Sequence, residues 1–165
     1  MDLVVFGAQW LHVLLGIIWF GNSLVVAAIL IPSLNLLPIP MQREVGARYG
    51  ERATSVFNVV VPLLIILGVV RGTLLGPIKD VGDVFGTPYG ATWLVAFVAA
   101  IVTFLWGRIV INGALQRMNA APVNADGTAT VQLEAETARV KLVVVLELVG
   151  FVVIFTCMIL MGLDR

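Results

Sequence analysis

The sequence predicts an all-α integral membrane protein whose four spanning helices pack as an antiparallel bundle. Of its 165 residues, 60% are hydrophobic and only 12% are charged, whereas soluble domains carry about a quarter charged residues. Four apolar stretches reach the roughly 20 residues that a helix needs to cross a bilayer. We therefore expect a single membrane domain over residues 1–165.

The four predicted spans cover about residues 3–31, 56–75, 90–112 and 140–162. Pro32 ends the first span and Pro77 follows the second, as is typical of helix ends. Pro40 begins a short surface helix that leads into the second span. The segment 126–128, Asp-Gly-Thr, predicts a turn and the cap of a helix that is longer than the fourth span.

The basic side chains predict the orientation in the membrane. They are concentrated in the segments 32–55 and 113–141, which carry Arg43, Arg48, Arg52, Arg117, Arg139 and Lys141. Because basic segments stay in the cytoplasm, both termini should lie outside. We expect a multi-pass protein of a bacterial-type inner membrane, with the lipid bilayer as its partner. Its formal net charge of zero argues against binding of nucleic acid.

His12, the one histidine of the chain, is the main candidate for chemistry. It lies inside the first span, where a polar side chain is costly and marks a functional site by default. Gly16, Trp19 and Ser23 follow it at helical spacing, so this stripe should face the bundle interior. Two interpretations stay open: His12 bonds a neighbouring backbone carbonyl or side chain, or it holds a metal, a haem or a proton.

Three sulfur-bearing residues, Cys157, Met158 and Met161, lie near the outer end of the fourth span, in the same membrane half as His12. Imidazole, thiolate and thioether are the ligands that select Cu(I). The sequence therefore predicts a copper site formed by these four residues. The alternative is that the sulfur side chains serve only as apolar packing.

Arg71, near the outer end of the second span, also has two interpretations. Its guanidinium either reaches the membrane surface or faces inward and holds an anion, such as a lipid phosphate or a haem propionate. In the haem case, His12 would be an axial ligand of haem b and Arg71 a propionate partner. With one histidine, such a haem needs a methionine, another weak ligand or a second protomer as well.

Arg108 and Glu147 fall at similar depth in the third and fourth spans. We expect an ion pair between them, because pairing relieves the cost of two charges in the membrane. The alternative is a proton or cation path in which Glu147 is the carrier.

Gly68, Gly72 and Gly76 form two overlapping GxxxG units on the second span. Small residues four positions apart let helices approach closely. The sequence leaves open whether they serve contacts within the bundle, a homodimer or a larger membrane complex.

Motifs of soluble enzymes are absent from the sequence: it contains no P-loop, no HExxH, no CxxC and no Ser-His-Asp set. With a single histidine, hydrolysis is disfavoured, and a non-catalytic role is the better expectation.

The segment 11–21, LHVLLGIIWFG, resembles the opening helix of the CopD-like membrane proteins, the family of the copper-resistance protein D domain. That helix reads His, several apolar residues, Trp, any residue and Gly, matched here by His12, Trp19 and Gly21. Tyr89 and Gly90, before the third span, are a second match. The order of spans is also similar to that of the HemJ-type protoporphyrinogen oxidase.

The resemblance implies copper handling or haem-linked chemistry with His12 as the ligand. Both families commonly place a Lys on the third span, where this chain has Ala96, and this departure argues against oxidase activity. The leading hypothesis is a CopD-like protein that binds or transfers Cu(I) in the outer half of the membrane. The alternatives are a haem b-binding protein with a redox or HemJ-like role, and a non-catalytic membrane subunit or dimer.

Overall fold

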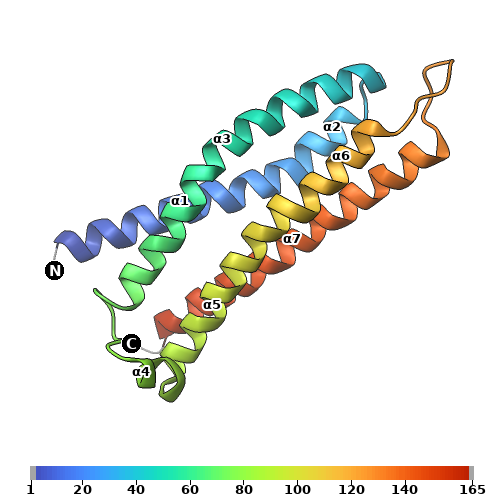
Figure 1. Ribbon diagram of the computed structural model, residues 1–165. Coiled ribbons are helices and arrows are strands. Elements are labelled where there is room, and N and C mark those ends of the chain that lie inside the picture. The colour runs from blue at the N-terminus through green and yellow to red at the C-terminus, as the bar shows by residue number, and fades with distance from the viewer. Residues whose placement is uncertain (1–2, 164–165) are drawn as a thin grey trace.

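The computed structural model describes residues 3–163, and Figure 1 shows four long helical rods that run back and forth. The first rod comprises α1 (Leu3–Val25), the π-helical η1 (Val26–Leu30) and α2 (Ile31–Leu34). The second rod is α3 (Ile39–Gly72), and the short α4 (Val81–Gly86) follows it. The third rod comprises α5 (Pro88–Leu105), the π-helical η2 (Trp106–Ile111) and α6 (Asn112–Ala120), and the fourth is α7 (Val131–Leu163).

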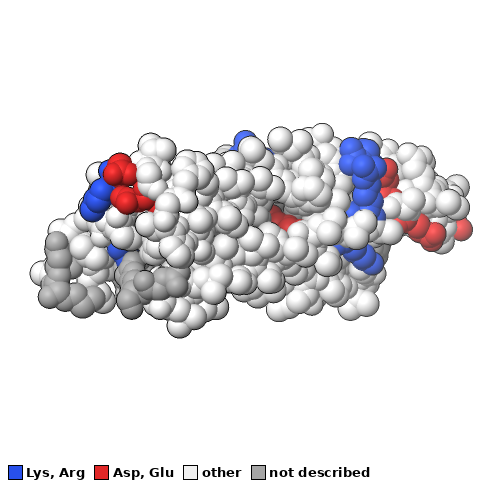
Figure 2. All heavy atoms as spheres, turned by 90° about the horizontal axis from the view of Figure 1, so that it is seen from below, with Lys and Arg blue, Asp and Glu red and all other residues white. Residues whose placement is uncertain are grey.

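All four rods are long and apolar enough to cross a membrane. Each extends past its predicted span at one end or both, although α3 stops at Gly72, before the predicted end at residue 75. At 1.5 Å per residue, the 34 residues of α3 extend about 51 Å, well beyond a hydrocarbon core of about 30 Å. Figure 2 shows the charged side chains gathered toward the two ends of the molecule, with a mostly uncharged belt between them. Large apolar side chains are exposed on every rod, as lipid contact requires.

The predicted surface helix and the second span are one continuous helix, α3, with Pro40 in its first turn. Proline is tolerated there because the first backbone N–H groups of a helix have no intrahelical partner. Pro62 lies inside the same helix, where it removes one backbone hydrogen bond. Figure 1 shows that α3 bends near its middle, as a proline in a helix interior explains.

The end of α3 corrects one expectation from the sequence. The helix stops at Gly72, so Gly76 lies in the connection to α4 and the second GxxxG unit is not helical. Gly76 is instead crowded by the backbone carbonyls of Arg71 and Gly72. A side chain there would collide with the turn that closes the helix.

The turn before α7 forms at the predicted place, although its cap lies two residues later. Gly127 has φ +83°, the left-handed conformation that glycine adopts at little cost. Two hydrogen bonds from Thr128 hold the pKa of the Asp126 carboxyl below its usual value. The first turn of α7 is then capped by the hydroxyl of Thr130, which accepts from the backbone N–H of Leu133 at 3.2 Å.

The rods pack mainly as α5 on α7 and α1 on α3, with further contacts between α3 and α5 and between α1 and α7. One apolar cluster has its buried members at Leu15, Trp19, Val61, Leu64 and Phe151. Another joins α6 and α7 through Ala114, Val140, Val143 and Val144. In Figure 1 the start of α1 and the end of α7, here called the chain ends, lie at the same end of the molecule as α4, and the two other connections lie at the opposite end.

We predict that Gly150→Ala destabilises the protein by about 1–3 kcal/mol, because its new methyl group overlaps the side chain of Thr103 where α5 meets α7. Thermal unfolding in detergent measures this effect. Gly7→Ala is the matched control, since nothing lies within 4 Å of a Cβ at that position. Thr103→Ala added to Gly150→Ala should recover part of the loss, and equal melting temperatures for the two glycine variants would contradict the packing.

Candidate functional site

His12 is held in one orientation by a hydrogen bond to α3. Its Nδ1 lies 3.1 Å from the backbone oxygen of Leu64. Because a carbonyl oxygen only accepts, Nδ1 must carry the proton and donate it, and this leaves the lone pair of Nε2 available. Metal-binding histidines almost always donate their other ring N–H in this way. The expected bond to a carbonyl is therefore present, and it also prepares the ring to be a ligand.

Two glycines of α3 make room for the aromatic rings of other helices. A Cβ at Gly68 would lie 3.1 Å from Cε1 of His12, and a Cβ at Gly72 would overlap the indole of Trp93. The same indole donates its N–H to the carbonyl of Gly68 at 3.2 Å. Gly68 and Gly72 thus serve contacts within one chain, between α3 and the side chains of α1 and α5.

His12 opens onto a cavity of about 420 Å³ between α1, α3, α5 and α7, which we call the His12 cavity. Arg71 turns into it, because its Nε donates to Oε1 of Gln9 at 2.6 Å. This bond ties Arg71 to the cavity wall, and its binding of an anion stays a prediction. The other residues with polar or sulfur-bearing side chains that line this cavity are Trp19, Tyr89, Trp93, Met158 and Met161.

The structure brings two of the three predicted sulfur ligands to this cavity. Met158 and Met161 line it together with His12, whereas Cys157 is buried and is not among the lining residues. Within residues 3–163, no three His, Cys, Asp or Glu side chains form a group that could hold a metal ion. A metal in this cavity would therefore depend on one imidazole and two thioethers. Ala96 also lines the cavity.

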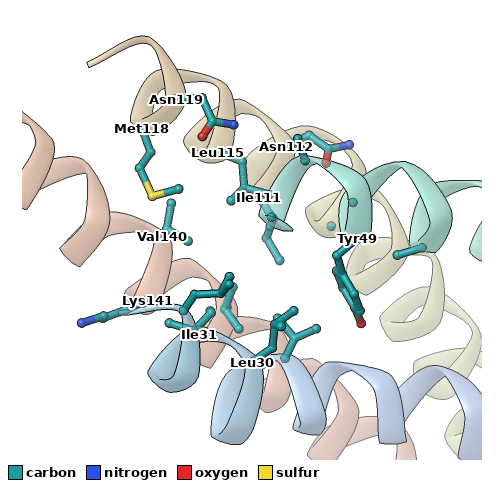
Figure 3. Close-up of a pocket in the computed structure, with 18 of the residues that line it drawn as sticks. Leu30, Ile31, Tyr49, Ile111, Asn112, Leu115, Met118, Asn119, Val140 and Lys141 are labelled. Atoms are coloured by element: carbon teal, nitrogen blue, oxygen red, sulfur yellow. The ribbon is translucent and has the colours of Figure 1, made fainter. Parts of the chain in front are cut away.

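A second and larger cavity, of about 730 Å³, lies toward the end of the molecule opposite to the chain ends. Figure 3 shows side chains from the first, second, third and fourth rods around it, with the Lys141 amine pointing away from its centre. Glu147 and Ser23 line this cavity, which we call the Glu147 cavity, as do Asn58 and Asn112.

Sequence reasoning found Glu147 and Arg108 but missed this cavity, because its polar residues are scattered over all four rods. A signal was present in the sequence: Asn22, Asn58 and Asn112 each interrupt a stretch of apolar sequence, and all three line this cavity. The hydroxyl of Tyr49 donates to the side-chain oxygen of Asn22, which joins α3 to α1 at the cavity wall.

The predicted ion pair between Arg108 and Glu147 is wrong. Arg108 donates to the side-chain oxygen of Asn58 on α3 and lies 5.9 Å from the ring centre of Phe104. In the part of the chain that is described, the ion pairs within 4.0 Å join Arg48 to Glu44 and Arg117 to Glu136. Arg108 lies within η2, whose wider π-helical turn changes the direction in which side chains leave the helix.

Glu147 instead faces small neighbours. A Cβ at Gly107 would lie 3.0 Å from its Oε1, and the hydroxyl of Ser23 is within hydrogen-bonding reach of its carboxyl. Among residues 3–163, the ion pairs within 4.0 Å do not include this carboxyl group, which lies within the apolar part of α7.

A layer of buried apolar side chains separates the two cavities. Trp19, which is only 6% exposed, lines both of them. Leu64 and Phe151 face the His12 cavity and Val61 faces the Glu147 cavity, and all four belong to one buried cluster. The ring of Phe151 meets that of Trp19 edge to face, with ring centres 4.8 Å apart. The expected stripe of His12, Gly16, Trp19 and Ser23 thus runs along the inward face of α1.

Comparison with known proteins found no matching family model, and neither a curated protein nor a solved structure gave a significant match. The resemblance to CopD-like proteins therefore stays a prediction, carried by the residues that were quoted for it.

We predict that a double-mutant cycle between Arg108→Met and Asn58→Leu gives a coupling of about 0.6 kcal/mol, the average for hydrogen bonds between helices in a membrane. The same cycle between Arg108→Met and Glu147→Gln should be additive, because the two side chains do not pair. Thermal unfolding in detergent measures both cycles. Strong coupling in the second cycle with none in the first would show that Arg108 pairs with Glu147 rather than with Asn58.

Proposed function

We propose that this protein is a CopD-like inner-membrane protein that binds Cu(I) in the His12 cavity. In this proposal its rods form an antiparallel bundle with both termini on the outer side, so the His12 cavity lies in the outer half of the membrane. The observation that carries the proposal is the imidazole of His12, which is hydrogen-bonded to Leu64 through Nδ1 and lines a cavity that two methionines also line.

The chemistry of these donors supports a soft monovalent ion. Neutral imidazole and thioether carry no charge, so they favour Cu(I) over harder divalent cations that need carboxylates. A site of Met158, Met161 and His12 also needs no deprotonation when the ion enters. No proton has to leave the ligands when Cu(I) binds or return to them when it is released. This suits transfer of the ion rather than its storage.

We predict that purified protein binds about one Cu(I) per chain and that His12→Ala abolishes this binding, because the lone pair of Nε2 is the strongest donor in the cavity. Competition with a chromophoric Cu(I) chelator and metal analysis measure the affinity and the stoichiometry. Met158→Leu and Met161→Leu should each weaken binding while keeping the volume of the side chain.

Cys157→Ala is the matched control, since Cys157 is buried on the same helix but does not line the cavity. It should bind copper as the wild type does. Unchanged copper binding in a folded His12→Ala protein would refute the proposal. Loss of binding in Cys157→Ala would show that the thiol of Cys157 is also a ligand.

Haem b is the second candidate, and the size and walls of the same cavity favour it. A volume of about 420 Å³ exceeds what a bare ion needs, and Trp93 and Phe97 stack at 5.4 Å in its wall. His12 and one methionine would hold the haem iron, and Arg71 would pair with a propionate.

We predict for this candidate a Soret band in gently purified protein that is lost in His12→Ala and weakened in Arg71→Gln, whereas Cys157→Ala retains it. An optical spectrum decides between the two candidates, because Cu(I) is colourless. Protein that binds neither copper nor haem would leave a non-catalytic membrane subunit as the function.

A further inference from the structure

The Glu147 cavity contains none of the residues proposed to hold copper or haem, and it brings a carboxyl group into the middle of the apolar rods. Glu147 lies on α7 within the apolar stretch 140–162 and lines the cavity. Carboxyl groups at this depth are rare, and those that occur mark ion pathways and proton relays. We propose that Glu147 is a proton-binding site at the closed end of a half-channel that opens on the side opposite to the chain ends.

The surroundings of the carboxyl group favour a proton over a metal cation. Its near neighbours are the hydroxyl of Ser23 and the backbone at Gly107. A calcium ion takes about six to eight oxygen ligands, with carboxylates prominent among them, and within residues 3–163 no group of three acidic side chains is present. A single proton needs only the carboxyl oxygen itself.

The charged and titratable groups around the cavity leave the carboxyl without a counter-ion. Arg108 of η2 is held by Asn58, and Arg43 of α3 donates to the backbone oxygen of Ala121 at 2.6 Å. The remaining ionisable residues that line the cavity are Tyr49 on α3 and Glu134 and Lys141 on α7. Because no cation neutralises the carboxylate, the membrane interior stabilises its protonated form.

The shape of the cavity supplies a route for the proton. Gln42, Asn119 and Glu134 line the end that lies beyond the apolar spans, and Asn112 lies between that end and Glu147. Trp19 and Val61 close the other end, since both belong to the buried apolar cluster. Protons can therefore reach Glu147 from one side of the membrane only.

A membrane-permeant carbodiimide tests this proposal on the whole protein. A protonated carboxyl adds across one C=N bond of the reagent, with its proton going to nitrogen and its oxygen to carbon. The adduct rearranges to a stable N-acylurea, and no group is lost. Peptide mass mapping then shows which carboxyl has reacted.

We predict that Glu147 is labelled near neutral pH and that the exposed Glu134 of the same cavity is not. Above the midpoint of the titration, labelling should fall about tenfold for each unit by which the pH is raised, as the protonated fraction does. Glu147→Gln should remove the label and keep the fold. Labelling of Glu134 equal to that of Glu147, or labelling of Glu147 that does not change with pH, would overturn the proposal.

The route is tested in a Cys157→Ala background, which removes the one native thiol. A cysteine introduced as Asn112→Cys should react in proteoliposomes with a membrane-impermeant cationic thiol reagent added on the side opposite to the chain ends. Ala96→Cys in the His12 cavity is the matched control and should not react from that side. Failure of Asn112→Cys to react from that side in a folded protein would refute the half-channel.

Discussion

The absence of water from a bilayer is the constraint that orders this structure. A polar group in the hydrocarbon region must find its partner inside the protein. The imidazole of His12 therefore reaches the carbonyl of Leu64, and the indole of Trp106 donates to the carbonyl of Val143 at 2.9 Å. Each of these bonds joins two different rods, so the groups that are costly in lipid are the same groups that fix how the helices pack.

Small residues allow those bonds to form. Gly68 and Gly72 leave space on α3 for the rings of His12 and Trp93. Gly150 leaves space on α7 for the side chain of Thr103. Packing in membranes relies on close contact, because burial of apolar surface gains little against lipid tails. The glycines thus act through the side chains they admit, and an interface with a second copy is not needed to explain them.

The sequence predicted the helical class, the four apolar stretches and the inward stripe of α1, because hydropathy and helical period depend on local composition. It also placed His12, Met158 and Met161 in one half of the protein. It could not predict the partner of Arg108, since η2 breaks the regular period of the third rod. Nor could it separate Cys157 from its neighbour Met158, because adjacent residues on a helix point about 100° apart and only the packed structure decides which of them meets a cavity.

Trp19 lines both cavities, so one indole forms part of the wall between the proposed copper site and the cavity that holds Glu147. The ring is held in this wall by its edge-to-face contact with Phe151, and both side chains belong to the buried apolar cluster. Because side chains in such a cluster are closely packed, the wall is a fixed part of the fold. A smaller side chain at position 19 would thin the lining of both cavities at once.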